Sequence, residues 1–146
     1  MNTPFTYTDK KLARKARRFC RKAHRGQKDN QSKPYYKHPF AVAASFTDGS
    51  MCQIIAYLHD VVEDTDYTFL DIQDRFGIFV GEMVAVLSRP EWLDYQTYIN
   101  AIKKQPTARL VKIADIRHNL AIDRALLNLA HQRRYAKALY ELTKED

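Results

Sequence analysis

Residues that interrupt helices are scarce in this sequence, and so are cysteines. The 146 residues include 4 glycines and 5 prolines, too few for a turn-dense β fold or a disordered chain. The two cysteines, Cys20 and Cys52, lie in segments of helical apolar spacing, so we expect reduced thiols in a cytosolic protein rather than a disulfide framework. No stretch approaches the ~20 apolar residues that a membrane-spanning helix needs, and the first residues lack a signal-peptide core. The sequence therefore predicts a soluble, cytoplasmic protein without a membrane segment.

Acidic residues are outnumbered, because 24 lysines and arginines face 17 aspartates and glutamates, for a net charge of +7. This excess is compatible with nucleic acid, an anionic membrane surface or a small polyphosphate as partner. Basic residues concentrate in 10–28 and 103–137 and acidic residues in 60–74, a distribution that a metal-dependent phosphate site would need. One face of the first predicted helix is strongly basic, but no aromatic side chains interleave it to stack bases. We therefore expect an ordinary solvated face there, which disfavours nucleic acid as a partner.

Apolar residues recur at helical spacing along the chain, and no segment sustains the period of two that a strand requires. Asp9 is predicted to cap the first helix, and Thr68 with Asp71 resembles the start of another. Residues 26–37 predict a loop, after which Pro39 is expected as a first helical residue. Further helices are predicted at 40–46, 69–76, 78–87, 94–104, 108–121 and about 126–142. One more is predicted to begin after the break at 48–50 and to run through the acidic residues that follow His59. We predict an all-α bundle of seven or eight helices in a single domain, residues 1–146 with a core of about 8–142.

The acidic segment, residues 59–65, directly follows an apolar run that predicts a core helix. On a helix, His59 lies one turn from Glu63, and Asp60 lies one turn from Asp64. An adjacent His and Asp can offer a nitrogen and an oxygen to one cation, a combination that suits Mn, Fe, Zn or Ni better than Ca. A solvated acidic helix end with a capped histidine would be the simpler explanation for a lone His-Asp pair. The larger group favours a cation site, because clustered acids are costly without a cation or a basic partner.

A second candidate group lies in the predicted helix at 108–121. Lys112, Asp115 and Asn119 share one face at helical spacing, next to a stripe of residues that we expect to point inward, Leu110 and Val111 among them. Asp115 can be a metal ligand with Asn119 beside it to bind substrate, or it can form an ion pair with Lys112 on a partly exposed helix. The residues of this helix alone favour the ion pair.

Four blocks of the sequence together resemble the hydrolase domain of the Rel/Spo alarmone enzymes, a branch of the HD-domain metal phosphohydrolases. They are Ala23-His24-Arg25-Gly26-Gln27, Pro34-Tyr35-Tyr36-Lys37-His38-Pro39, Leu58-His59-Asp60-Val61-Val62-Glu63-Asp64-Thr65 and Val111-Lys112-Ile113-Ala114-Asp115-Ile116-Arg117-His118-Asn119. Phe76-Gly77 also falls at a spacing that the family shows after its acidic block. The resemblance spans about residues 12–140 and implies the HD-domain helical fold in a stand-alone small hydrolase.

By position, the resemblance implies that His38, His59, Asp60 and Asp115 bind a metal. Two imidazoles and two carboxylates fit a divalent transition metal, and the resemblance implies manganese, with other such metals as alternatives. The substrate implied is a phosphorylated nucleotide, and an oligomer is compatible with the sequence.

The resemblance also implies catalytic and substrate-binding residues around this metal. Glu63 and Asp64 match the acidic pair that the family uses to position and deprotonate the attacking water, and Asn119 matches a residue that contacts the substrate. The candidates for neutralising the substrate phosphates are Lys112, Arg89, Lys33, Arg25 and Lys37.

Three further histidines match no metal ligand of the family. We expect His24 to be structural or to support a ligand from behind. His118 is expected on a different face from Asp115 and therefore in a structural role, and His131 is expected on the surface.

Two positions depart from the alarmone hydrolases, where an Arg-Lys pair helps to hold the guanine nucleotide. Asp29 and Asn30 stand at these positions. The leading prediction remains a guanosine-3′,5′-bis(diphosphate) 3′-pyrophosphohydrolase of the stringent response, in which water attacks a phosphate held at the metal. The alternatives are an HD-type phosphatase for another phosphorylated nucleotide, such as a dinucleotide cofactor or a cyclic nucleotide, a non-catalytic nucleotide-binding protein, and a basic nucleic-acid-binding module.

Overall fold

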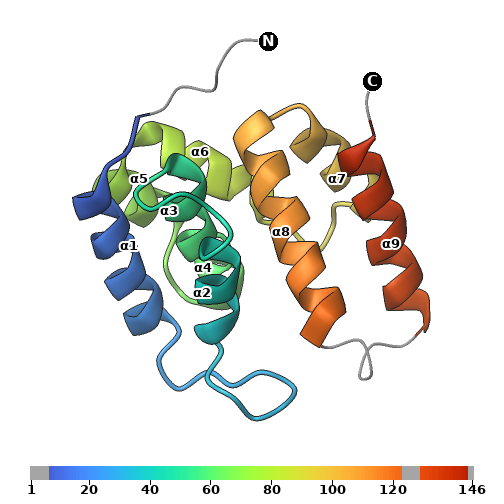
Figure 1. Ribbon diagram of the computed structural model, residues 1–146, viewed down its shortest axis with the longest axis horizontal. Helices are drawn as coiled ribbons and strands as arrows, with labels where there is room; N and C mark the ends of the chain where they lie inside the picture. The colour runs from blue at the N-terminus through green and yellow to red at the C-terminus, as the bar shows by residue number, and fades with distance from the viewer. Residues whose placement is uncertain (1–6, 123–128, 145–146) are drawn as a thin grey trace.

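The computed structural model describes residues 7–122 and 129–144, and the described chain is almost entirely helical (Figure 1). The helices are α1 (Lys10–Ala23), α2 (Lys37–Ala43), α3 (Met51–Leu58), α4 (Val61–Asp64), α5 (Phe69–Phe76), α6 (Ile78–Leu87), α7 (Tyr95–Lys103), α8 (Pro106–Ile122) and α9 (Leu129–Thr143). Within these ranges, the only extended pairing is an isolated bridge between Lys28 and Pro34 in the loop after α1. The predicted all-α fold is therefore confirmed.

Helix α3 lies at the centre of the bundle, where it contacts α1, α2, α6 and α8 (Figure 1). Its side chains Ile54, Ile55 and Leu58 are all 0% exposed, so apolar residues surround the helix rather than forming one stripe. Full burial of each such side chain stabilises the fold by about 1.5–3 kcal/mol. Ser50 begins the helix by accepting a hydrogen bond from the backbone N–H of Gln53, at 3.1 Å. The residues at the end of α3 are therefore held in place by the densest part of the core.

The helix predicted to run through the acidic segment is broken after Leu58. His59 (φ −63°, ψ −25°) ends α3, and Asp60 (φ −102°, ψ −3°) precedes the short helix α4. This break separates α4 from α3 and gives nine helices in the described ranges, where seven or eight were expected. It also leaves His59 within reach of α8, as described below.

Local capping signals in the sequence are confirmed. The Asp9 side chain accepts a hydrogen bond from the N–H of Leu12 at 2.9 Å, and Thr68 with Asp71 forms a reciprocal capping box at the start of α5. Cys20 is buried, Cys52 is half-buried, and both are free thiols, as expected. Burial raises the pKa of both thiols, which keeps them protonated.

Three local predictions were wrong. Helix α2 begins at Lys37 rather than at Pro39, and α8 begins at Pro106 rather than after it, because proline is tolerated in the first turn of a helix. Leu110 was expected to point inward but is 52% exposed. The reason is that α8 packs against α2, α3, α6, α7 and α9 with its other residues, such as Val111 and Ile116, which are fully buried. Of the last predicted helix, residues 126–128 lie outside the described residues.

None of the helices in the described part of the chain combines the length and the apolar character that crossing a membrane would require.

Candidate metal centre

The four predicted metal ligands meet where α2, the break between α3 and α4, and α8 come together. His38 Nε2 lies 2.7 Å from Asp115 Oδ1 and 3.8 Å from Asp60 Oδ2. His59 Nε2 lies 3.2 Å from Asp60 Oδ2 and 3.4 Å from Asp115 Oδ1. One ligand atom each from His38, His59 and Asp115 can be chosen so that all three lie within 4.8 Å of one another. Packing of three separate elements therefore brings two imidazoles and two carboxylates to one point.

His59 has the orientation that a metal ligand requires. Its Nδ1 lies 2.6 Å from the backbone carbonyl of Ala56, and because a carbonyl only accepts, the proton is on Nδ1. Its Nε2 is buried and has no hydrogen-bond partner among the described residues. Burial would lower the pKa of His59, but the charges and contacts of Asp60 and Asp115 raise it well above its ordinary value. A divalent cation would replace the proton that these carboxylates otherwise attract, so the donor set fits a metal.

His38 is oriented by a second histidine that the sequence did not identify as part of the site. The two Nδ1 atoms of His38 and His118 lie 2.7 Å apart, and the ring centroids are separated by 4.9 Å. His118 thus contacts Nδ1 of His38, while Nε2 of His38 faces the carboxylates of Asp115 and Asp60. The expectation that His118 and Asp115 lie on different faces was wrong, because residues three apart on a helix are neighbours.

Asp60 is held by Tyr35, another residue to which no role was assigned from the sequence. The Tyr35 hydroxyl donates a hydrogen bond to Asp60 Oδ2 at 2.7 Å. Burial and the charge of Asp60 raise the pKa of Tyr35, so the hydroxyl stays a donor. Burial would also raise the pKa of Asp60, but the contact with His59 outweighs it and lowers that pKa to about 2. Tyr35 stands three residues before His38, in the second of the four sequence blocks that resemble the family. This position could have indicated that Tyr35 contributes to the site.

Asp115 takes part both in the cluster and in the ion pair that its helix predicted. Lys112 Nζ lies 2.9 Å from Asp115 Oδ2, and Asn119 Nδ2 donates to Asp115 Oδ1 at 3.4 Å. Burial would raise the pKa of Asp115, but the Lys112 charge and the nearby imidazoles of His38 and His59 hold it well below its ordinary value. The ammonium group of Lys112 is paired with Asp115 in this contact. Burial would lower the pKa of Lys112, but the charge of Asp115 outweighs this effect and raises the pKa well above its ordinary value. The predicted ion pair is therefore confirmed, whereas the role of Asp115 as a metal ligand stays a prediction.

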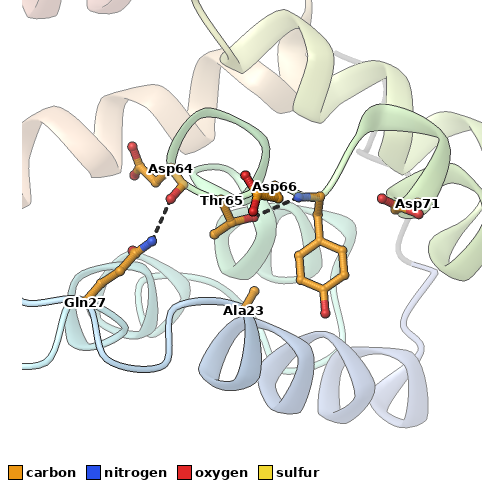
Figure 2. A pocket seen from close by; sticks show the side chains of 7 residues that line it. Ala23, Gln27, Asp64, Thr65, Asp66 and Asp71 are labelled. Atoms are coloured by element: carbon orange, nitrogen blue, oxygen red, sulfur yellow. Dashed lines mark hydrogen bonds between the residues drawn. The ribbon is translucent and has the colours of Figure 1, made fainter.

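Glu63 and Asp64 lie on α4, at the exposed rim of the cluster. The backbone N–H of Arg89 donates to the Glu63 carboxylate, and Gln27 Nε2 donates to the backbone carbonyl of Asp64 at 2.6 Å. Surrounding protein atoms raise the pKa of both carboxyl groups, and the negative charge of Asp60 adds to the effect. Asp64 faces a cleft of about 610 Å³, in which the hydrogen bond from Gln27 is visible (Figure 2).

The predicted phosphate-binding cations are scattered. Lys112 lies against the cluster, whereas the Arg89 guanidinium donates to the backbone carbonyl of Leu93 at 3.1 Å. Arg25 lines a separate cleft at the end of α1. The other two predicted cations, Lys33 and Lys37, are exposed in and just after the loop that follows α1.

His24 and Asp29 make hydrogen bonds within the loop that follows α1, and His131 lies on the surface. His24 is 1% exposed, and its Nδ1 lies 2.8 Å from Gln27 Oε1. His131 is exposed, as expected. Asp29 accepts hydrogen bonds from the N–H groups of Gln31 and Lys33 at 2.8 and 3.0 Å, so its carboxylate closes the loop on itself.

Comparisons with known proteins point to one family. The HD domain family matches residues 16–143. The chain is 34% identical over 123 residues to the GTP pyrophosphokinase rsh of Brucella melitensis, which covers 75% of this chain and 16% of that protein. It is 32% identical over 124 residues to the bifunctional (p)ppGpp synthase/hydrolase SpoT of Escherichia coli K12, covering 75% of this chain and 18% of SpoT. It is 33% identical over 140 residues to the guanosine-3′,5′-bis(diphosphate) 3′-pyrophosphohydrolase of Haemophilus influenzae, covering 85% of this chain and 20% of that enzyme.

The fold matches a solved structure over almost its whole length. A metazoan ortholog of SpoT that hydrolyzes ppGpp and plays a role in starvation responses superposes with a TM-score of 0.74 at 28% identity. The match covers 94% of this chain and 88% of the solved chain. By contrast, the chain spans between 16% and 20% of the length of the three curated relatives above.

Proposed function

This chain belongs to the HD-domain family, and from that membership we propose that it is a metal-dependent hydrolase that removes the 3′-pyrophosphate of guanosine tetra- or pentaphosphate. The observation that carries the proposal is the buried, unpaired Nε2 of His59, which lies 3.2 and 3.4 Å from carboxylate oxygens of Asp60 and Asp115. The names of the SpoT-type relatives, and the solved ppGpp-hydrolysing ortholog, support the choice of substrate.

We assign the metal to His38, His59, Asp60 and Asp115, with manganese as the ion. When bound, such an ion would supply Lewis acidity toward a phosphate oxygen and would lower the pKa of a bound water. The chain's own contribution is to hold the ligands before the ion arrives. The Ala56 carbonyl orients His59, and the Tyr35 hydroxyl orients Asp60.

Glu63 and Asp64 are assigned to the attacking water. Their raised pKa values make these carboxylates better proton acceptors near neutral pH than ordinary surface carboxylates. One of them accepts a proton from the water as its oxygen attacks phosphorus, and the bond from phosphorus to the 3′ oxygen breaks. The 3′ oxygen takes up the proton that the carboxylate accepted and leaves as a hydroxyl, while the oxygen of the water stays on the pyrophosphate. Asn119, whose amide lies at the edge of the cluster, is assigned to binding the substrate. The exposed cations in and just after the loop, Lys33 and Lys37, are assigned to the same role.

A second candidate function is favoured by the loop that follows α1. Asp29 uses its carboxylate to accept hydrogen bonds from two backbone N–H groups, and Asn30 is exposed beside it. This loop therefore lacks the basic pair with which the alarmone hydrolases hold guanine nucleotides. The alternative is an HD-type phosphatase that acts on another phosphorylated nucleotide, for example a dinucleotide cofactor or a cyclic nucleotide, with the same metal ligands.

We also propose that residues 1–146 form a single HD domain with its core at about 8–142, and that it acts in the cytoplasm, in the stringent response. The HD-domain match over residues 16–143 supports the extent of this core.

The experiment that tests the function is a turnover screen of the Mn-loaded protein. Guanosine tetraphosphate, phosphorylated dinucleotides and cyclic nucleotides would be incubated with the protein, and ion-exchange chromatography would separate pyrophosphate from phosphate. We expect pyrophosphate and GDP from the tetraphosphate, and at least about a hundredfold less product with the Glu63→Gln variant as control. Turnover of another nucleotide alone would establish the second candidate. Metal binding with no turnover of any nucleotide would instead indicate a nucleotide-binding protein.

A further inference from the structure

A second cleft lies between the end of α1 and the loop that leads to α2. Its volume is about 550 Å³, and four of the residues that line it carry a positive charge, Arg18, Arg21, Lys22 and Arg25. No residue of this lining is acidic. We call this feature the basic cleft. Its size falls within the range of about 300–1,000 Å³ that small-molecule sites occupy.

Within residues 7–122 and 129–144, no ion pair neutralises the four cations of the basic cleft. Among the ion pairs of the described residues, none involves Arg18, Arg21, Lys22 or Arg25. The helix dipole stabilises the charges of Arg21 and Lys22, which stand in the last turn of α1. It stabilises Arg18 and Arg25 less, because Arg18 precedes that turn and Arg25 follows the helix. The Arg21 guanidinium lies 5.1 Å from the ring centroid of Tyr36, which holds its planar group in place.

The wall of the basic cleft contains a buried polar atom that lacks a partner. His24 lines the cleft and is 1% exposed, and its Nδ1 is occupied by Gln27 at 2.8 Å. Its Nε2 is buried and has no hydrogen-bond partner among the residues that the structure describes. Buried polar atoms without partners are uncommon in folded proteins. A residue that lines the basic cleft therefore keeps an unused hydrogen-bonding group.

The basic cleft shares one lining residue, Gln27, with the cleft of about 610 Å³ shown in Figure 2. Gln27 lines both clefts, with its Oε1 toward His24 and its Nε2 donating to the backbone carbonyl of Asp64 at 2.6 Å. None of the residues assigned to the metal lines the basic cleft. The substrate of the metal centre and a ligand of the basic cleft would therefore occupy different places, linked through Gln27.

We propose that the basic cleft binds a small anion that carries a di- or triphosphate group, and that its occupancy is sensed at Asp64 through Gln27. Guanidinium groups match phosphate oxygens with paired hydrogen bonds, and the cleft has three of them together with an ammonium group. The concave shape, bounded by Pro34 and Tyr36, favours a compact phosphorylated molecule over an extended nucleic acid.

Binding is tested by calorimetry on the full chain, with inorganic pyrophosphate as the probe and EDTA present so that no metal is available at the HD cluster. Arg21→Glu and Arg25→Glu should each weaken binding at least about tenfold, because each removes hydrogen bonds to a charged group. Lys11→Glu and Arg14→Glu make the same charge change on exposed residues of α1 outside the cleft, and should weaken binding by less than about threefold. Circular dichroism would check that all four variants are folded.

Three results would overturn the site. These are the absence of pyrophosphate binding, equal losses in the two pairs of variants, and tighter binding of a DNA duplex that depends on all four positions. The last result would mean that α1 is a nucleic-acid surface, and it would show a steep loss of affinity with salt.

The connection to Asp64 is tested by amide NMR on the same EDTA-treated protein. Saturating pyrophosphate should shift the signals of Asp64 and Thr65, and the same concentration should leave them unmoved in Arg21→Glu. Binding without any shift at these residues would overturn the connection. Neither measurement uses turnover, so failure of this proposal and failure of the proposed hydrolase are distinguishable.

Discussion

Asp60 and Asp115 differ from Glu63 and Asp64, although all four carboxylates are proposed for one site. The first pair faces histidines, and Asp115 also faces Lys112, so the pKa of each carboxyl is held below its ordinary value despite burial. In the second pair, protein atoms exclude water without supplying an equivalent cation, so the pKa of each carboxyl is raised. The pKa of a carboxyl group is thus shifted in opposite directions at Asp60 and at Glu63, three residues apart.

This contrast shows how one short segment can serve two purposes. A carboxylate with a low pKa stays ionised and suits a permanent metal ligand, whereas one with a raised pKa suits a group that accepts a proton during the reaction. The break at His59 and Asp60 is what divides the two environments. It leaves Asp60 beside the histidines and places Glu63 and Asp64 one turn further, at the rim.

Removal of Asp115 should have the largest effect. Asp115→Ala deletes a proposed ligand and leaves the Lys112 charge buried without a partner, so we expect loss of metal, loss of turnover and destabilisation by about 3 kcal/mol or more. Metal content would be measured by mass spectrometry and stability by denaturant unfolding. The double variant Asp115→Ala/Lys112→Met should recover much of the stability but none of the metal. Full metal content in Asp115→Ala would refute the ligand assignment.

Glu63→Gln tests the other pair, and it should separate chemistry from metal binding. We expect turnover to fall by about 10²–10⁴-fold, because a proton acceptor is lost, while the metal content and the unfolding midpoint stay near those of the unmodified protein. Steady-state kinetics and metal analysis on the same preparation would measure both. If the variant were to lose its metal, Glu63 would be a ligand, and the division between the two pairs would fail.

Removing the support of a ligand should have an intermediate effect. His118→Ala deletes the partner that lies 2.7 Å from His38 Nδ1, and we expect metal affinity to fall by about 10–100-fold with the ligand itself intact. Competition with a metal-binding dye would measure the affinity. His131→Ala, at an exposed histidine, is the matched control and should leave the affinity unchanged. Equal effects of the two variants would remove His118 from the site.

The smallest effect is expected at Asp29 and Asn30, which lie in the loop after α1 and outside the cluster of metal ligands. Asn30→Lys restores one positive charge at an exposed position, and we expect the KM for guanosine tetraphosphate to fall a few-fold with kcat little changed. Asp29→Lys should help less, because it also removes the carboxylate that accepts hydrogen bonds from two backbone N–H groups. Initial-rate kinetics would compare the two variants. An unchanged KM in both would mean that another group has taken over recognition of this nucleotide.

Much of the fold could be predicted because its signals are local. The Asp9 cap, the Thr68–Asp71 capping box and the apolar run of α3 each involve residues within a turn or two, and helical spacing alone defines them. Errors arose where packing decides, as at Leu110, whose apolar character says nothing about which face of α8 meets the core. The family match likewise agrees with the resemblance, because ordered motifs survive where the overall identity is modest.

The residues that surround the ligands could not be predicted in the same way. His38 and His118 are 80 positions apart, and Tyr35 and Asp60 are 25 apart, so their contacts exist only once α2, α3 and α8 have packed together. The sequence by itself determined the helices and their caps, since these follow from short-range spacing, and the resemblance to a family indicated the types of ligand. Only the tertiary structure decided which carboxyl groups have a lowered pKa and which have a raised pKa. That outcome depends on burial and on neighbouring charges, which belong to the packed molecule and not to any one segment.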